Sequence, residues 1–157
     1  MLSITTMLEL FKWYKHNLVE VEIFDPRGHR VRFLETDFVH LIKLVNKYGE
    51  EPRNARKAIE EIERGRIELV AGRFDAQRAQ ELSWARDIVT DPWHIVANWQ
   101  PLGRANPGEA YIRNCGTEEQ PQHRVLICAI SGKLRRPVTI FPREAFSSKH
   151  LAGKLWP

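Results

Sequence analysis

The chain has 157 residues, of which 43% are hydrophobic and 28% charged, and its formal net charge is +4. This length and composition are typical of one globular domain and argue against a long disordered chain. The sequence has no apolar run of about 18 residues, which would predict a membrane span, and we find no leader that would predict secretion. We therefore expect a cytoplasmic protein without membrane partners.

The first part of the chain predicts a helix followed by a β-hairpin. Residues 3–17 carry apolar side chains at helical spacing, and residues 1–18 are interpreted as a tether or interface that precedes a single α+β domain, 19–157. Apolar and polar residues alternate before and after the turn sequence DPRG at 25–28, where proline presets one backbone angle and glycine supplies a positive φ.

Three helices are expected next. Thr36 or Asp37 caps the first of them, and Pro52 opens the second at a favoured early position. Residues 66–70 are interpreted as a short strand or as a connector between helices. The predicted helices cover 38–48, 52–64 and 76–88.

The remainder predicts strands joined by short loops that contain glycine or proline, and a tail with one short helix. Connections this short favour antiparallel neighbours. We therefore expect an α+β fold in which helices pack on a small antiparallel β-sheet, preceded by an N-terminal helix and a β-hairpin. The predicted strands cover 93–100, 109–115, 123–131 and 136–141.

Cofactor and metal sites have no support in the sequence. Cys115 and Cys128 could form one disulfide, but they are expected to be reduced core thiols, because they lie in or beside strand-like segments and Cys128 lies in the apolar run VLICAI. No CxxC spacing is present, which argues against a zinc site built on cysteines. The histidines are too scattered to predict metal ligands, and phosphate-loop, dinucleotide, zinc-protease and hydrolase motifs are missing. We expect no metal and no cofactor.

The second half of the chain is basic, with nine lysines and arginines against four glutamates between residues 104 and 154. Such an excess attracts polyanions, and RNA is the leading candidate. Arginine forks bind phosphate oxygens in pairs, and Thr139 could add a hydrogen bond. The alternative is a basic turn with strand residues that face solvent. The candidate cations are Arg113, Arg124, Lys133, Arg135 and Arg136.

His40 is the leading candidate for acid–base chemistry, because Lys43 follows three residues later and projects from a nearby face of the predicted helix. The alternative is a half-buried histidine that fills space. His94 is interpreted as structural, and His123, beside Arg124, as a weakly indicated acid or base.

Five tryptophans are many for a chain of this length. Trp84, Trp93 and Trp99 are expected in the core. Trp13 or Trp156 could stack on nucleic-acid bases, although packing or an interface would explain them equally well.

The order of elements resembles the barnase, EndoU, colicin and RelE superfold (BECR fold) of phage-associated nucleases. The resemblance covers roughly residues 19–142 and rests on the hairpin VEIFDPRGHRVRF, which leads into a helix with Phe38-Val39-His40, and on the later strands YIRN, VLICAI and PVTIF. Members are metal-independent ribonucleases, several of them toxins, that pack helices on a small antiparallel sheet. The sequence departs from the pattern at Leu44 and Val45, where a second histidine is expected.

The resemblance implies an RNA endonuclease of the toxin or phage-derived type, which cleaves by 2′-hydroxyl attack and has an antitoxin or immunity protein as a possible partner. The implied catalytic residues are His40, Arg124, Thr139 and Lys133. The implied phosphate-binding residues are Lys43, Arg113, Arg135 and Arg136. The alternative is a non-catalytic RNA- or protein-binding module of the same fold. A DNA-binding regulator is a third interpretation, but the sequence has no helix with the polar residues of a recognition helix.

Overall fold

The computed structural model describes residues 4–49, 51–69, 74–97 and 108–156. The α-helices are α1 (Met7–Tyr14), α2 (Glu35–Leu41), α3 (Val45–Tyr48), α4 (Pro52–Glu63), α5 (Phe74–Leu82), α6 (Ala85–Thr90) and α7 (Ser148–Leu151), and a π-helical turn, Lys15–Val19, follows α1. The strands are β1 (Arg30–Val31), β2 (His94–Ala97), β3 (Gly108–Asn114), β4 (His123–Ser131), β5 (Leu134–Arg143) and β6 (Lys154–Trp156).

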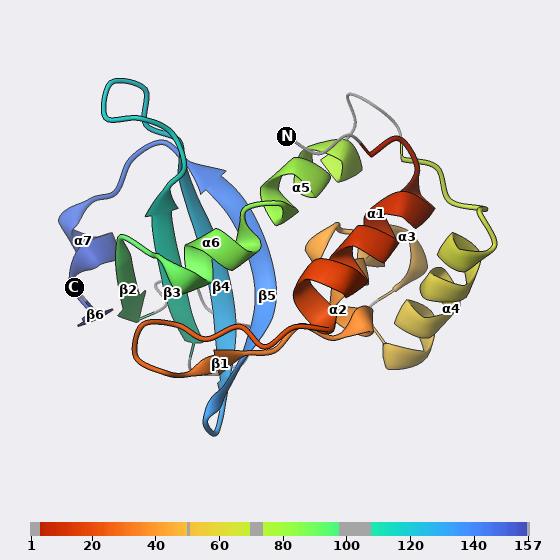
Figure 1. The fold of residues 1–157 in the computed structure, drawn as a ribbon, viewed down its shortest axis with the longest axis horizontal. Helices are drawn as coiled ribbons and strands as arrows, with labels where there is room; N and C mark the ends of the chain where they lie inside the picture. The colour runs from red at the N-terminus through yellow and green to blue at the C-terminus, as the bar shows by residue number, and fades with distance from the viewer. Residues whose placement is uncertain (1–3, 50, 70–73, 98–107, 157) are drawn as a thin grey trace.

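The six strands form one sheet in the order β1-β5-β4-β3-β2-β6, with helices α1 to α4 gathered beside it and α6 crossing it (Figure 1). The α+β class is confirmed. The sheet is mixed, because β1 pairs with β5 in parallel while the other pairs are antiparallel. None of the helices in the described ranges has the length and apolarity to cross a bilayer.

The predicted hairpin is reduced to its turn and a few hydrogen bonds. Gly28 adopts φ 88° and its N–H donates to the Asp25 carbonyl at 2.9 Å, as the turn sequence predicts. Only Phe24 and Arg30 form a bridge between the two arms. The second arm is β1, whose pairing with β5 continues in a hydrogen bond from Arg32 N–H to the Arg135 carbonyl.

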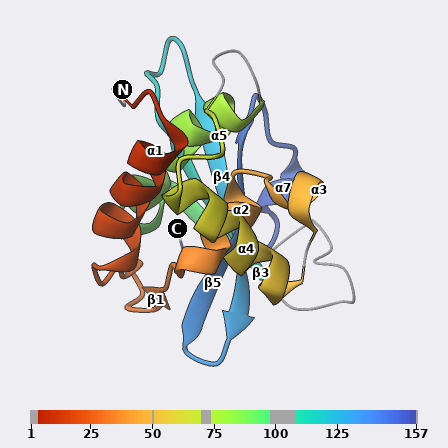
Figure 2. The same cartoon turned by 90° about the vertical axis from the view of Figure 1, so that its right-hand side faces the viewer.

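Helix α1 belongs to the main core, and it is not the separate tether or interface that we expected from residues 1–18. Its Met7, Leu10, Phe11 and Tyr14 are fully buried. The Tyr14 hydroxyl also donates to the Leu34 carbonyl at 2.6 Å, which ties α1 to the start of α2. In the perpendicular view, α2 and α4 lie in front of the strands and α1 stands to their left (Figure 2).

Two predicted helices are interrupted. The helix predicted at 38–48 begins earlier, as α2, and breaks at Lys43, which adopts φ 66°. The helix predicted at 76–88 is divided into α5 and α6 by a turn at Ser83 and Trp84. Residues 66–69 connect α4 to the following segment without forming a strand, and β6 is a strand that the sequence did not indicate. Residues 98–100 of the first predicted strand, Trp99 included, and Arg104 lie outside the described residues.

The two faces of the sheet have different surroundings. The first face packs against the helices and contributes Tyr111, Leu126, Cys128 and Ile140 to the main core. The second face has its own smaller apolar cluster, which the chain around α7 covers in part. That cluster consists of Val96, Ala110, Ile112, Val125 and Ile127, with Phe141, Phe146 and Leu151 packed against it.

Candidate functional site

The structure separates the predicted pair His40 and Lys43. His40 lies in the last turn of α2 and is partly exposed, whereas Lys43 follows the end of that helix in a left-handed conformation. The Lys43 N–H donates to the His40 carbonyl at 3.1 Å. Because α2 ends at Leu41, the helical spacing that was expected to aim both side chains from nearby faces does not extend to Lys43.

The predicted catalytic set does not meet in one place. Arg124 lies near the start of β4 and Lys133 in the turn after its end, so the strand from Arg124 to Ser131, at about 3.3 Å per residue, already separates them by roughly 23 Å. Thr139 pairs with Ile127 and shares the second face, whereas Arg124, two residues before Leu126, shares the first face with it and faces the helices. These three side chains therefore cannot hold one phosphate.

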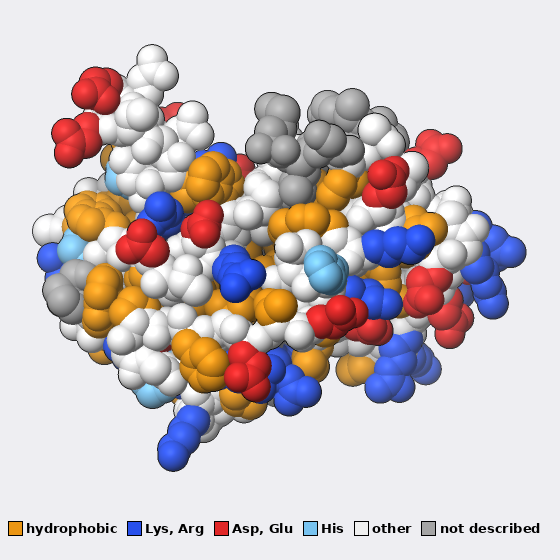
Figure 3. Space-filling view, in the orientation of Figure 1, with side chains coloured by type: hydrophobic (Ala, Val, Ile, Leu, Met, Phe, Trp, Pro, Cys, Tyr) orange, Lys and Arg blue, Asp and Glu red, His pale blue; other side chains and the backbone are white. Residues whose placement is uncertain are grey.

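The predicted arginines are neutralised within the protein. Arg113 donates to Asp91 Oδ2 at 2.8 Å and Arg124 to Glu81 Oε2 at 2.6 Å. Arg136 bonds both carboxylate oxygens of Asp37, at 2.9 and 3.0 Å. Lysine and arginine side chains are scattered over the face in Figure 3 and do not form one patch. Arg113, Arg124 and Arg136 thus form ion pairs that join elements of the fold, not the phosphate-binding cluster that we expected.

Arg135 belongs to a buried charge network between the 25–28 turn and the sheet. Glu109 accepts hydrogen bonds from Arg27 Nη1 and Nη2, both at 2.8 Å, and from Arg135 Nε. Asp25 accepts from Arg27 Nη2 at 2.8 Å and from the Tyr111 hydroxyl at 2.7 Å. The Asp25 side chain is fully buried, and those of Glu109 and Arg135 are 4% and 8% exposed.

Protonation in this network follows from burial and pairing. Burial alone would raise the pKa of Asp25, but the hydrogen bonds from Arg27 and Tyr111 outweigh it and hold that pKa below its ordinary value. The pKa of Glu109 is lowered for the same reason, with Arg27 and Arg135 as its donors. Burial raises the pKa of Tyr111. Both carboxylates are therefore charged at neutral pH and act as structural anchors.

A different group of side chains meets at one end of the second face. His123 starts β4, and its register partners are Asn114 on β3 and Arg143 on β5. The His123 ring stacks on Trp93, with centroids 5.7 Å apart and an interplanar angle of 24°. Trp93, which was expected in the core, is 46% exposed. The prediction for Trp93 was wrong because it precedes the four-residue strand β2 and lies at the rim of the sheet.

The second imidazole of this group comes from α7. Phe146 contacts both histidine rings, with centroid distances of 5.3 Å to His123 and 6.2 Å to His150. Arg143 Nη2 lies 3.0 Å from His150 Nε2, and the guanidinium sits 5.9 Å from the centre of the Phe146 ring. His123 and His150 thus both contact Phe146, while Trp93 stacks on His123 and Arg143 contacts His150, and we call His123, His150, Arg143 and Trp93 the rim site.

Local structure fixes the orientation of both imidazoles. Ser147 N-caps α7, and its N–H donates to His150 Nδ1 at 3.1 Å, while its hydroxyl lies 3.3 Å from the same nitrogen. His150 Nε2 is therefore turned toward Arg143. Nδ1 of His123 is buried without a hydrogen-bond partner among the described residues, which leaves Nε2 as the nitrogen that can reach a ligand.

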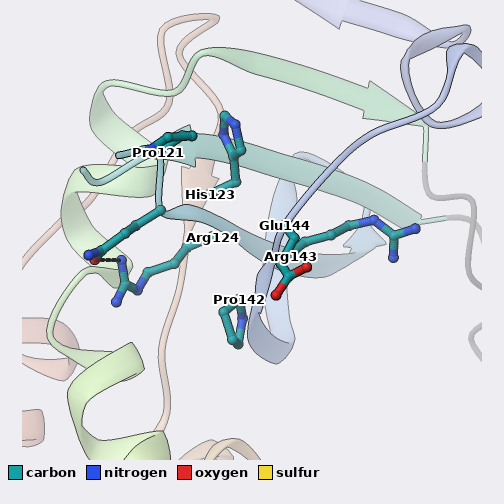
Figure 4. Close-up of a pocket in the computed structure, with 7 residues that line it drawn as sticks. Pro121, His123, Arg124, Pro142, Arg143 and Glu144 are labelled. Atoms are coloured by element: carbon teal, nitrogen blue, oxygen red, sulfur yellow. Dashed lines mark hydrogen bonds between the residues drawn. The ribbon is translucent and has the colours of Figure 1, made fainter. Parts of the chain in front are cut away.

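Two cavities adjoin His123. One, of about 450 Å³, is lined by residues 121–124 and 142–144, and Figure 4 shows Arg124 and Arg143 extending from it in opposite directions. The other, of about 420 Å³, is lined by Asp91–Trp93, Arg113, Asn114, Glu118 and His123. Since His123 borders both cavities, a chain-like ligand could occupy them together.

Only weak signals for this site are present in the sequence. His123 was only weakly indicated as an acid or base, and His94, interpreted as structural, is 91% buried beside Trp93, with ring centroids 4.2 Å apart. His150 and Arg143 were missed. The pattern Ser147-x-x-His150 does resemble a capping box, and it could have indicated a fixed imidazole at a helix start.

Comparisons with known proteins identify no relative: no protein-family model, no curated protein and no solved structure matches the chain. Within the described residues, no three or more His, Cys, Asp or Glu side chains form a group that could hold a metal ion. The functional argument therefore depends on the geometry of the rim site.

Proposed function

We propose that the chain is a metal-independent RNA endonuclease in which His123, His150 and Arg143 carry out the reaction. The observation that carries this proposal is that two imidazoles contact Phe146, beside the exposed Trp93, and that the Arg143 guanidinium contacts one of them, His150. Two histidines can move the two protons of RNA transesterification, and an arginine can neutralise the phosphate between them.

In the proposed reaction, His123 Nε2 removes the proton from the ribose 2′-hydroxyl. The 2′-oxygen then attacks the adjacent phosphorus, and the bond from phosphorus to the 5′-oxygen breaks. Protonated His150 gives its Nε2 proton to the departing 5′-oxygen. The products are a 2′,3′-cyclic phosphate and a 5′-hydroxyl, and no further reactant is consumed.

In neutral His150, Nδ1 accepts the hydrogen bond from Ser147 N–H, which leaves the ring proton on Nε2, the nitrogen proposed to serve the leaving group. Arg143 would bind the non-bridging phosphate oxygens and stabilise the charge that develops on them. The phosphate anion in turn offsets the like charges of Arg143 and His150.

The cytoplasm suits this activity, because RNA is present there and the chain carries two free thiols, Cys115 and Cys128. An RNA-binding module without catalysis would need only the stacking surface of Trp93. The experiment below separates the two functions.

The test is incubation of the purified chain with single-stranded RNA in excess EDTA, followed by analysis of the RNA ends. We expect products that end in 2′,3′-cyclic phosphate and 5′-hydroxyl, and no cleavage of an all-deoxy strand. His123→Gln and His150→Gln should each lose at least about 100-fold in rate. Glutamine at 150 can still accept the capping hydrogen bond from Ser147 N–H, so the helix start is retained.

Two histidine variants serve as matched controls. His16→Gln changes an imidazole that is 83% exposed on the π-helical turn, and His40→Gln removes the histidine that the sequence favoured. Both should cleave at the wild-type rate. A wild-type protein that binds RNA without cutting it supports the binding module instead, and unchanged cleavage by His123→Gln or His150→Gln refutes this site.

A further inference from the structure

The cavity on the Trp93 side of His123 is lined by an indole and two carboxylates among other residues. It adjoins His123, so a nucleotide whose phosphate lies at the rim site can place its base there. One nearly parallel contact already exists at this point, between the indole of Trp93 and the imidazole of His123. Because 46% of Trp93 remains exposed, the same indole can also stack on a nucleotide base.

Two carboxylates, those of Asp91 and Glu118, line this cavity together with Arg113 and Asn114. The Asp91 side chain is 78% exposed, and only its Oδ2 is engaged by Arg113, at 2.8 Å. Arg113 also donates to the Asp91 carbonyl at 2.6 Å, so the carboxylate is held in place at the edge of the cavity. Glu118 supplies a second carboxylate, from the loop between β3 and β4.

That loop has a defined conformation. Asn114 Oδ1 accepts hydrogen bonds from the N–H groups of Gly116 and Gln122, both at 2.9 Å. A Cβ at Gly116 would lie only 2.4 Å from the Gln120 carbonyl oxygen, so the loop closes tightly at a glycine. Figure 3 shows acidic side chains at the tip of the protrusion that this loop forms in Figure 1.

We infer that this cavity binds an unpaired base next to the scissile phosphate and selects bases that carry an exocyclic amino group. Trp93 provides the stacking surface, and Asp91 and Glu118 accept hydrogen bonds from the base edge. Adenine, cytosine and guanine each present an amino donor to these carboxylates, whereas uracil presents carbonyl oxygens on both sides of its single N–H. The cavity therefore disfavours uracil. This inference rests on the proposed nuclease function, whose phosphate site it extends.

Cytosine and uracil provide the sharpest comparison, because they differ at the edge only by an amino group in place of an oxygen. Oligonucleotides would carry one ribonucleotide in a deoxy strand, with cytosine or uracil on either side of the scissile phosphate. When the variable base stands at one of these two positions, we expect the oligonucleotide with cytosine to be cleaved at least about 10-fold faster than the one with uracil. The double variant Asp91→Asn, Glu118→Gln should lose this preference, and Glu119→Gln, a neighbouring exposed carboxylate of the same loop, should keep it.

A binding assay separates this inference from the nuclease proposal. All-deoxy oligonucleotides cannot be cleaved, and a base stacked on Trp93 should quench its fluorescence. The signal is isolated as the difference between wild type and Trp93→Leu. We expect the cytosine oligonucleotide to quench at about 10-fold lower concentration than its deoxyuridine counterpart.

The outcomes are distinct. Cleavage without a cytosine preference, at a rate that Trp93→Leu does not change, would overturn the base pocket and leave the nuclease standing. Absence of cleavage together with cytosine-selective quenching would overturn the nuclease and support the pocket. Equal quenching in wild type and Trp93→Leu would mean that no base stacks on this indole, and the inference would fail.

Discussion

Replacing Glu109 by glutamine tests whether the buried charge network holds the 25–28 turn against the sheet. The carboxylate is 4% exposed and accepts three hydrogen bonds from two guanidinium groups. Glutamine keeps one acceptor oxygen, but it removes the negative charge and turns an amide donor toward an arginine. Arg27 retains Asp25 as its partner, whereas Arg135, 8% exposed, loses its only carboxylate among the described residues.

The expected cost follows from leaving one buried charge unpaired. Removing one partner of a buried ion pair costs about 3–5 kcal/mol, and the low end applies here because Arg27 keeps a partner. We therefore expect Glu109→Gln to lower the free energy of unfolding by about 3 kcal/mol. With a urea m-value of about 2 kcal/mol/M, the unfolding midpoint would fall by roughly 1.5 M.

The assay is urea unfolding followed by far-UV circular dichroism. Asp91→Asn is the matched control, because it removes a carboxylate that is 78% exposed from an arginine pair and should cost less than about 1 kcal/mol. Adding Arg135→Met to Glu109→Gln should recover part of the loss, because the unpaired guanidinium is then gone. If Glu109→Gln costs no more than Asp91→Asn, the network does not anchor the turn and the reasoning is refuted.

Two further predictions concern titration and thiol chemistry. The pKa values of Asp25 and Glu109 lie below their ordinary range in the folded chain, so their stabilisation is complete at neutral pH and is lost as acid protonates them, between about pH 5 and pH 2. The free energy of unfolding, measured across that range, should fall on acidification. Its slope against pH should be shallower in Glu109→Gln, and an unchanged slope would contradict the assignment. Burial raises the pKa of both thiols, and Cys128 is fully buried while Cys115 is partly exposed. A thiol reagent at pH 8 should therefore label Cys115 slowly and Cys128 only after unfolding, and rapid labelling of both in the native protein would show that the core is more open than described.

Local sequence patterns determined most of the individual elements. Helix α4 lies between Pro52 and Gly65 as predicted, because a proline at the first turn and a glycine after the last residue act through their own backbone preferences. Strands β3 and β4 match their predicted ranges closely, since apolar residues fill both segments and turn residues bound them. These signals are local, so they are visible in a single sequence.

The tertiary structure alone decided which charged residues are available. Every arginine that we expected at the phosphate, Arg113, Arg124, Arg135 and Arg136, is paired with a carboxylate that lies between 22 and 99 residues away in the chain. The composition showed an excess of positive charge, but it could not show where the acids would lie in space. Long-range pairing of this kind depends on strand register and on which sheet face a side chain occupies.

The candidate site, too, is formed only by the tertiary structure. His123 and His150 are separated by 27 positions, and both contact Phe146 only because the end of β5 and the short helix α7 bring His150 back over the second face of the sheet. Trp93 is exposed because it stands at the rim, before β2. Period and composition determine that a strand or helix forms, whereas the convergence of distant side chains requires the pairing of β3, β4 and β5, which no local pattern specifies.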